Sequence, residues 1–260
     1  ELTEGAIDEL VRHAITKLSQ LHFTAMDEYS NRVIQMGEQP ERVFTVGEVG
    51  LDNLLRMPLM SREDFENSIA CKLKKRNLLF TYHPETTQNL TKIENDFCEI
   101  LKALSTQDDT LIIFTKANAD VGGRLINKMI DVFVLEHPEN AIVFTSLGQL
   151  RYLSALQYMD AVVGNSSSGI VEAPSFKLAT INIGNRQKGR VRADSTIDVS
   201  ADAIEIVSAL NKIYSPIYKA SLAKVVNPYG QGNSTKKVVD ALKSVELDSL
   251  KIKTFYDVKY

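Results

Sequence analysis

A short run of small polar residues has the composition expected of a phosphate-binding loop. The hexapeptide 164–169 reads Gly-Asn-Ser-Ser-Ser-Gly, and it places Ser166 and Ser167 at the start of a predicted helix. Small residues allow backbone N–H groups to approach a phosphate, and a helix start favours an anion. Glu172 follows in the same helix, where its carboxylate could accept hydrogen bonds from both hydroxyls of a ribose. A serine-rich helix cap without a ligand has the same composition, so the hexapeptide alone leaves both interpretations open.

Basic side chains follow two other apolar stretches. His83 ends one stretch, directly before Pro84, and Arg186 and Arg190 follow another, with Lys188 between them. A lone histidine is usually structural, and a loop with a few basic residues is usually solvated. The position of both groups after predicted strands favours a ligand or acid/base role for His83. It also favours a phosphate or ribose contact for Arg186 and Arg190.

Acidic residues gather at the other end of the chain. Glu1, Glu4 and Asp8 lie at the start of a helix that the apolar spacing between residues 7 and 18 predicts. Acidic side chains stabilise the positive end of a helix dipole, and this role is sufficient to explain Glu4. For Glu1 and Asp8 the pattern does not separate this structural role from a catalytic one.

The elements that must carry these residues alternate regularly from residue 77 onward. Apolar strand patterns occur at 78–82, 111–114, 142–144, 161–163 and 179–183. Helical patterns occur between and after them, at 90–104, 123–135, 149–157, 170–175, 203–213 and 235–244. This alternation predicts a parallel sheet with right-handed crossovers, as in a Rossmann-like domain. Ligands of such sheets bind beyond the carboxyl ends of the strands. Four polar loops follow strands here and should line one cleft: 83–87, 116–123, 164–169 and 184–190.

The first part of the chain predicts another, shorter unit. It has strand patterns at 21–25 and 43–46, a helix at 27–36 that stops at Gly37, and a hinge region at 51–62. We expect residues 1–55 to be the C-terminal part of an N-terminal Rossmann-like domain. Residues 56–245 should form a complete C-terminal domain, and residues 246–260 a tail. The predicted fold class is α/β, with two Rossmann-like domains of which the first is incomplete in this chain.

The composition argues against several classes of partner. The 260 residues have a formal net charge of -3, with no block of Lys and Arg long enough to follow a nucleic-acid backbone or an acidic membrane. No apolar run approaches the ~20 residues that cross a bilayer, and the N-terminus has no signal-peptide pattern. Cys71 and Cys98 lie far apart, in no metal-ligand or redox spacing. We therefore expect a cytoplasmic enzyme that binds neither nucleic acid nor membrane.

Taken together, the motifs resemble the hydrolysing UDP-N-acetylglucosamine 2-epimerase family. Its members include the bacterial sialic-acid and legionaminic-acid epimerases and the epimerase domain of a bifunctional animal enzyme. The matching strings occur in family order, at 1–17, 83–86, 118–120, 164–169, 181–190 and 227–233. Several separate motifs in order are a far more specific signal than a single glycine-rich loop.

The resemblance implies two Rossmann-like domains of the GT-B type, with the active site between them. It makes Glu1 and Asp8 catalytic carboxylates, with His83 assisting the departure of the diphosphate. It implies that UDP is bound by a set of polar residues: His83, Asn118, Asp120, Ser166, Ser167, Glu172 and Arg186. It calls for no cofactor and no metal ion, and it implies a homo-oligomer, either a dimer or a tetramer.

The family reaction removes the proton at C2 of a UDP-N-acetylhexosamine while UDP departs, and water then adds to release the free 2-epimer. This chemistry needs a base near C2, an acid that returns the proton, and charge compensation for the diphosphate. The resemblance places the chain in sialic-acid or legionaminic-acid biosynthesis. UDP-N-acetylglucosamine and UDP-N,N'-diacetylbacillosamine both fit as substrates.

The chain departs from the family pattern at its N-terminus. The family has an Arg-containing loop after its first strand and a further catalytic Asp, and neither is in this sequence. Glu1 falls at the end of what is a Gly-Gly-Glu motif in the family. Two alternative functions therefore stay open: a GT-B glycosyltransferase with a UDP-sugar donor, and a non-catalytic UDP-sugar-binding protein. The acidic and basic residues of segment 1–13 argue against the transferase.

Overall fold

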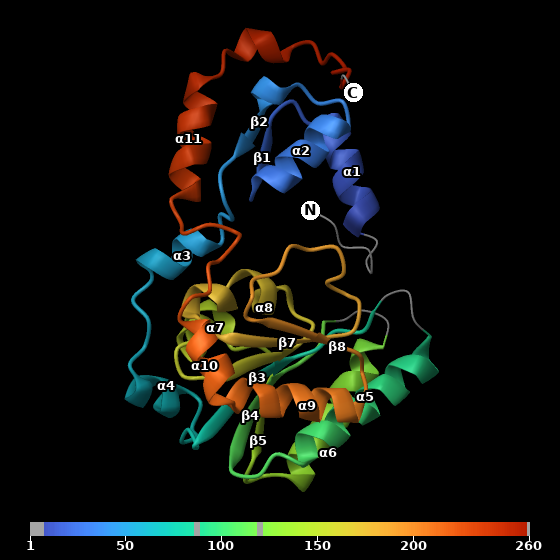
Figure 1. The fold of residues 1–260 in the computed structure, drawn as a ribbon, viewed down its shortest axis with the longest axis vertical. Helices are drawn as coiled ribbons and strands as arrows, with labels where there is room; N and C mark the ends of the chain where they lie inside the picture. Colours follow the sequence, from blue (N-terminus) through green and yellow to red (C-terminus); the bar gives the residue numbers. More distant parts are fainter. Residues whose placement is uncertain (1–7, 86–88, 119–121, 259–260) are drawn as a thin grey trace. The chain divides into compact units, whose positions relative to one another are not determined.

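The computed structural model describes residues 8–85, 89–118 and 122–258 of the chain. Internal contacts divide these residues into two compact units. Unit 1 comprises residues 8–57 and 227–258, and unit 2 comprises residues 58–226. Figure 1 labels most of the helices and strands of both units.

Unit 2 is built on a six-stranded sheet whose strands all run parallel, in the order β5-β4-β3-β6-β7-β8. The strands are β3 (Arg76–Thr81), β4 (Thr110–Thr115), β5 (Ala141–Phe144), β6 (Ala161–Gly164), β7 (Ala179–Ile183) and β8 (Thr196–Val199). This is the 3-2-1-4-5-6 order of a doubly wound Rossmann domain. The order reverses between β3 and β6, which is where such domains bind their ligands.

Helices cover both faces of this sheet. They are α4 (Arg62–Ser68), α5 (Leu90–Ser105), α6 (Gly123–Glu136), α7 (Gly148–Ala155), α8 (Ser167–Val171), η2 (Ala173–Phe176), α9 (Ala203–Tyr214) and α10 (Pro216–Leu222). Side-chain caps fix several of these starts; for example, Ser61 accepts from the Asp64 N–H and Asn89 accepts from the Lys92 N–H.

The apolar strands of the sheet are buried on both sides. Leu78 and Phe80 of β3 belong to one core cluster with residues of α5, α6 and α9, which cover that face (Figure 1). Leu79 points to the opposite face, because successive residues of a strand alternate. On that face α8 packs tightly: a Cβ on Gly169 would lie 2.7 Å from Cγ2 of Thr180. Burial on both faces explains why these strands read as continuous apolar runs in the sequence.

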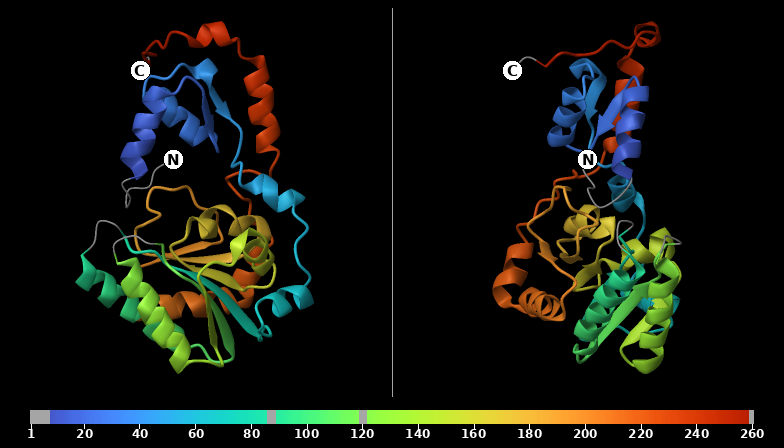
Figure 2. Two further views of the ribbon diagram at one scale, coloured as in Figure 1. Left: turned by 180° about the vertical axis from the view of Figure 1, so that it is seen from behind. Right: turned by 90° about the vertical axis from the view of Figure 1, so that its right-hand side faces the viewer.

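Unit 1 contains a pair of short parallel strands, β1 (His22–Thr24) and β2 (Val43–Thr45), coloured blue in Figure 2. Its other elements are α1 (Asp8–Leu18), α2 (Asp27–Gln35), η1 (Pro40–Arg42), α3 (Leu51–Arg56), α11 (Ser234–Ser244) and η3 (Leu247–Leu250). The rings of Phe23 and Phe44 stack across the two strands, with their centroids 5.6 Å apart. The small sheet therefore packs through its own cross-strand pair.

The C-terminal part of the chain belongs to unit 1. Asp52 of α3 accepts hydrogen bonds from the backbone N–H groups of Ser234 and Thr235, at 2.9 and 2.7 Å, and so caps α11. The hydroxyls of Tyr29 and Tyr229 lie 3.2 Å apart. The structure therefore differs from the expected domain boundary: residues 227–245 pack with unit 1, whereas the sequence placed them in the second domain. Helical spacing in α11 shows that a helix forms but not which partner covers it.

A buried carboxylate holds the end of the chain to unit 1. Glu38 accepts hydrogen bonds from Lys17 at 2.6 Å and makes an ion pair with Lys253 at 2.5 Å, and it lies 2.8 Å from Nε2 of His22. Burial by itself raises the pKa of Glu38, but the hydrogen bonds from Lys17, Lys253 and His22 outweigh it and lower the pKa. The Glu38 cluster therefore joins α1, β1 and the C-terminal segment through charge.

The parallel α/β sheet confirms the predicted fold class, and the five strands predicted from residue 77 onward all form in unit 2. Two elements of unit 2 were not predicted, β8 and α10. β8 is a four-residue edge strand in which only Ile197 and Val199 are apolar, too short a pattern to recognise. The helical pattern at 170–175 is wrong in its start: α8 begins at Ser167, three residues earlier, with Ser166 as its N-cap. Among the described residues, no helix is long and apolar enough to span a membrane.

Candidate functional site

The candidate site lies at the carboxyl ends of β3 and β6. Thr81 and Gly164 are partners in the parallel register, and the Asn165 N–H donates to the Thr81 carbonyl at 3.0 Å. Gly164 has φ +124°, and a Cβ there would lie 2.0 Å from the Thr81 carbonyl oxygen. Only glycine allows the two strand ends to approach this closely. The approach brings His83 beside the serine-rich loop.

Asn165 ties these strand ends together. Its Oδ1 accepts from the His83 N–H at 2.7 Å, and its Nδ2 donates to the His83 carbonyl at 2.8 Å. Asn165 is fully buried, so both bonds are shielded from water. Its own backbone carbonyl accepts from Nη1 of Arg186 at 3.1 Å and from Nε2 of Gln187 at 2.8 Å. One residue therefore links the loops after β3, β6 and β7.

The His83 imidazole is oriented by the loop after β4. The Asn118 N–H donates to Nδ1 of His83 at 3.1 Å. A nitrogen that accepts a hydrogen bond carries no proton, so the neutral ring must be protonated on Nε2. Asn118 thus acts through its backbone, while its side chain is exposed. The ring can then donate a hydrogen bond through Nε2 alone.

The serine-rich loop begins α8. The hydroxyl oxygen of Ser166 accepts from the Ser168 N–H at 3.3 Å, which makes Ser166 the N-cap. A hydroxyl has one donor and two acceptor positions, so Ser166 can cap the helix and still donate to an anion. Ser167 is exposed in the first helical position, whereas Ser168 is buried. The cap and the ligand role, which the sequence left as alternatives, are therefore compatible.

Glu172 and Tyr152 both lie close to Ser168. Glu172 is the C-cap of α8, and its N–H donates to the Ser168 carbonyl at 2.9 Å. Tyr152 of α7 has a buried hydroxyl near the hydroxyls of Ser168 and Ser166. Burial raises the pKa of Tyr152 far above its ordinary value, and the Glu172 carboxylate raises it further, while the two serines oppose the change. Tyr152 is therefore a neutral hydroxyl beside the serine-rich loop.

The structure brings together most of the residues predicted from the sequence. His83, Asn118, Ser166 and Arg186 lie in loops that Asn165 or its neighbours connect, and Ser167 and Glu172 lie on α8 beside them. Glu1 and Asp120 lie outside the described residues. Asp8 is the exposed first residue of α1, in unit 1.

Three residues with clear roles at the site were not predicted. Asn165 and Gln187 connect the loops, and Asn127 of α6 holds the backbone of Ala117 through two hydrogen bonds, of 2.7 and 3.2 Å. An amide that directly precedes the serines was the only signal in the sequence. It did not show that the partner of Asn165 lies 82 positions away.

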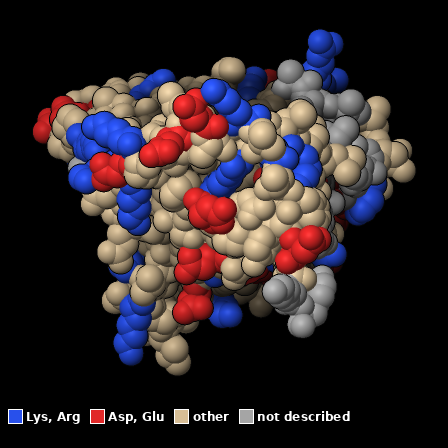
Figure 3. Space-filling model, turned by 90° about the horizontal axis from the view of Figure 1, so that it is seen from above, with Lys and Arg blue, Asp and Glu red and all other residues tan. Residues whose placement is uncertain are grey.

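Acidic and basic side chains are interspersed on the face shown in Figure 3, with no block of one sign. Within the described ranges, no group of three or more His, Cys, Asp or Glu side chains is placed to hold a metal ion. The anion-binding potential of the site therefore comes from local donors, namely Arg186, the serine hydroxyls and backbone N–H groups.

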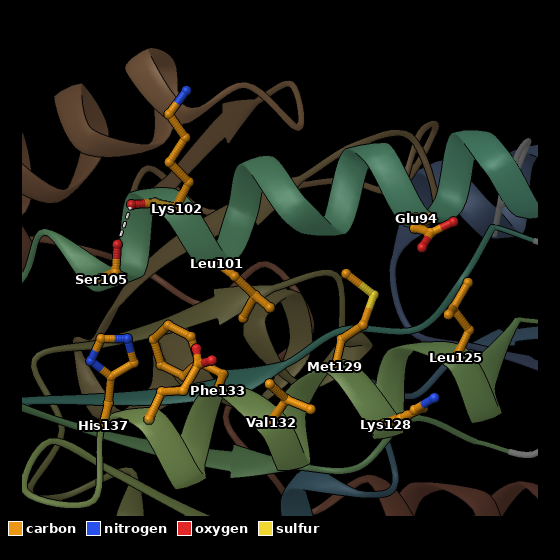
Figure 4. A pocket seen from close by; sticks show the side chains of 11 residues that line it. Glu94, Leu101, Lys102, Ser105, Leu125, Lys128, Met129, Val132, Phe133 and His137 are labelled. Atoms are coloured by element: carbon orange, nitrogen blue, oxygen red, sulfur yellow. Dashed lines mark hydrogen bonds between the residues drawn. The ribbon is translucent and has the colours of Figure 1, made fainter.

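Two hollows in unit 2 have different chemical character. An apolar groove of about 440 Å³ lies between α5 and α6 and is lined by residues such as Leu101, Met129 and Phe133 (Figure 4). Of the predicted site residues that the structure describes, none lines this groove. A polar hollow of about 420 Å³ at the ends of β7 and β8 includes Asn185 and Lys188, which flank Arg186 in the sequence. The polar hollow, unlike the groove, shares a loop with the candidate site.

Known proteins match this chain along almost its whole length. The GDP/UDP-N,N'-diacetylbacillosamine 2-epimerase (hydrolyzing) of Campylobacter jejuni is 39% identical over 259 residues, which are 99% of this chain and 67% of that protein. Polysialic acid biosynthesis protein P7 of Escherichia coli is 36% identical over 260 residues, 99% of this chain and 66% of that protein. The chain therefore spans about two thirds of the length of the curated relatives it matches.

The fold agrees with solved structures of the same kind. The UDP-GlcNAc 2-epimerase of Neisseria meningitidis, solved bound to UDP-GlcNAc, has a TM-score of 0.76 at 17% identity, over 92% of this chain and 65% of that chain. At this identity the likeness concerns the fold, which has the GT-B architecture with a first domain that is incomplete here. The family model described as UDP-N-acetylglucosamine 2-epimerase matches residues 1–243. The motifs, the fold and this match agree: the chain belongs to the UDP-N-acetylglucosamine 2-epimerase family.

Proposed function

We propose that the whole protein is a hydrolysing 2-epimerase that converts a UDP-N-acetylhexosamine into the free 2-epimeric sugar and UDP. The observation that carries this proposal is the meeting of three donor-bearing loops at the point where the strand order reverses. Asn165 connects these loops through His83 and Arg186. A nucleoside diphosphate suits this place because its phosphates need several convergent donors.

Each group has a distinct part in binding UDP. Arg186 and the hydroxyls of Ser166 and Ser167 contact the diphosphate, and their charge and hydrogen bonds stabilise it as it departs. His83 adds a hydrogen bond through its Nε2–H. Glu172 accepts from the ribose hydroxyls, and Asn118 and Asp120 complete the nucleotide site. Unit 2 thus supplies the affinity for UDP and the stabilisation of the leaving group.

The sugar chemistry requires groups that hold and move a proton at C2. We assign this part to the carboxylates of Glu1 and Asp8, as the family resemblance implies. One takes the C2 proton while the bond to UDP breaks, and an acid returns a proton to the opposite face as water adds at C1. The relatives' names support UDP-N,N'-diacetylbacillosamine or UDP-N-acetylglucosamine as the substrate, and one of them names polysialic acid biosynthesis. We propose a role in sialic-acid or legionaminic-acid biosynthesis. We further propose a cytoplasmic homo-oligomer, a dimer or a tetramer.

Titration calorimetry of this chain with UDP tests the binding half of the proposal. Arg186→Ala, Glu172→Ala and the double variant Ser166→Ala with Ser167→Ala should each weaken UDP binding about tenfold to a hundredfold, the value of hydrogen bonds to a charged group. Arg76→Ala is the matched control. Arg76 begins β3 at the opposite end of the strand from His83, with its guanidinium 4.2 Å from the Tyr214 ring centroid. Unchanged affinity in the three site variants would reject this site.

Turnover by the whole protein tests the chemical half. Incubation of each UDP-sugar without any acceptor should release UDP and the free 2-epimer. In D₂O the product should carry deuterium at C2, because the returned proton comes from solvent. UDP release that depends on an added sugar acceptor would instead indicate a glycosyltransferase. Binding without release would indicate a sensor.

A further inference from the structure

His83 is held by its backbone and its ring at the same time. The backbone is held by the Asn165 side chain, through the bonds of 2.7 Å to the N–H and 2.8 Å to the carbonyl. An asparagine amide offers one acceptor and one donor group, so it matches a backbone N–H and C=O in a single orientation. The two bonds therefore fix the position of His83 relative to the start of α8.

The orientation of the ring is fixed by a second asparagine, Asn127, which holds the residue that precedes Asn118. Asn127 of α6 accepts from the Ala117 N–H at 2.7 Å and donates to the Ala117 carbonyl at 3.2 Å. The next residue is Asn118, whose N–H donates to Nδ1 of His83. Gly123 allows the backbone of Asn118 to lie against the start of α6, because a Cβ at position 123 would lie 2.0 Å from the Asn118 carbonyl oxygen. Asn127 therefore aims the N–H that selects the protonated nitrogen of the ring.

Together the two amides leave the ring one orientation and one tautomer. A proton on Nδ1 would face the Asn118 N–H, two donors opposed at a distance of 3.1 Å between the nitrogens. A rotated ring would leave that N–H without its acceptor. The same arrangement, in which a second residue fixes the tautomer of a functional histidine, is common at sites where imidazole must present a defined nitrogen.

We propose that Asn165 and Asn127 are positioning residues that hold His83 as the Nε2–H tautomer, so that Nε2 donates to the diphosphate of UDP. The part that concerns UDP rests on the proposed function. The part that concerns the ring does not, because it can be measured without a ligand. Neither asparagine needs to touch UDP for this role.

The test compares Asn127→Ala and Asn165→Ala with a matched control, Asn77→Ala. Asn77 makes the same pair of bonds to a backbone, accepting from the Lys74 N–H at 2.9 Å and donating to the Lys74 carbonyl at 3.0 Å. It is buried, like Asn165, but it lies at the amino end of β3. Loss of this pair should lower the melting temperature and leave the His83 ring unchanged. Asn127 is only half-buried, so its variant keeps the test decisive if Asn165→Ala does not fold.

The first readout is the ¹⁵N chemical shift of the His83 ring nitrogens without ligand, assigned with the variant His83→Gln. We expect only the Nε2–H tautomer in the wild-type protein and in Asn77→Ala. Asn127→Ala and Asn165→Ala should show averaged shifts from both tautomers. A single unchanged tautomer in Asn127→Ala, or a ring protonated on Nδ1 in the unchanged protein, would overturn the positioning role.

The second readout is UDP affinity in a double-mutant cycle. Asn127→Ala and Asn165→Ala should each weaken UDP binding about fivefold to thirtyfold, the effect of one misplaced hydrogen bond to a charged group. Asn77→Ala should weaken UDP binding less than about twofold. In the His83→Gln background, Asn127→Ala should cost less than about twofold, because its partner is already gone. If Asn127→Ala weakened UDP binding about fivefold to thirtyfold in the His83→Gln background as well, Asn127 would act on UDP binding by a route other than His83. Absence of UDP binding in the unchanged protein would reject the proposed function, while the ring shifts would still decide the positioning role.

Discussion

Replacing Gly164 with alanine should separate the strand ends on which the candidate site depends. Gly164 pairs with Thr81 in the register of β6 and β3, and the following N–H, of Asn165, donates to the Thr81 carbonyl at 3.0 Å. At φ +124°, an added Cβ would lie 2.0 Å from the Thr81 carbonyl oxygen and 2.7 Å from its carbon. The methyl group cannot be accommodated unless the two backbones move apart.

The cost has three parts that the structure allows us to size. A side chain at this positive φ costs about 1–3 kcal/mol in backbone strain. Forcing a buried contact apart costs about 1–3 kcal/mol more. The hydrogen bond to Thr81 contributes about 1 kcal/mol and would be lost or lengthened. Gly164→Ala should therefore lower the free energy of unfolding by about 3–7 kcal/mol, a large share of the roughly 5–15 kcal/mol of a typical domain.

Gly148→Ala is the control, since Gly148 also has a positive φ, of +65°, but its Cβ would meet nothing within 4 Å. It should cost only the strain of the left-handed region, about 1–2 kcal/mol. Urea unfolding followed by circular dichroism measures both variants, and UDP titration shows whether the remaining folded Gly164→Ala protein has lost affinity. Equal unfolding free energies, within about 0.5 kcal/mol, would refute the close approach of β3 and β6.

Two further predictions concern unit 1. Burial is the main cause that lowers the pKa of His22 from 6.5, and hydrogen bonds lower that of Glu38 from 4.5. Both depressed pKa values mean that the unfolded chain binds more protons, so stability should fall as the pH drops below about 6.5 and further below about 4.5. Glu38→Gln should cost about 1.5–3 kcal/mol at pH 7 by weakening the hydrogen bonds that the buried carboxylate accepts from charged Lys17 and Lys253, and should flatten the lower step in a melting-temperature profile; an unchanged profile would contradict this. Asp8→Asn should cost at most about 1 kcal/mol, the value of a helix-dipole contact. In the whole protein it should lower turnover about 10²–10⁴-fold if Asp8 moves the C2 proton, and normal turnover would return it to a structural role.

The fold of unit 2 was predictable because its strands are short apolar runs that end in polar loops. Residues 78–82 and 111–114 are buried on both faces, so their sequences alone mark them as central strands. β8 was not predictable, since an edge strand with Asp198 at its centre has one solvent-facing side. The partner of α11 was not predictable either. Both capping hydrogen bonds are accepted by Asp52, which precedes Ser234 by 182 positions and Thr235 by 183.

The candidate site was predictable to the extent that chemistry follows strand ends. His83, Ser166 and Arg186 were found because each follows a predicted strand, and parallel strands present their carboxyl ends on one edge. Their mutual arrangement depends on side-chain to backbone bonds between loops far apart in the sequence. Asn165 looks like one more small polar residue in its loop until His83 is placed beside it.

The hydrogen bonds described above for the candidate site join residues of unit 2. The two bonds from Asn165 to His83, those from Arg186 and Gln187 to Asn165, and the pair made by Asn127 involve residues 83–187 alone. The carboxylates assigned to the sugar, by contrast, belong to segment 1–8. Binding and turnover can therefore be separated by experiment. Changes at Asn127 or Asn165 should alter UDP affinity through His83, and changes at Asp8 should leave that affinity intact while removing turnover.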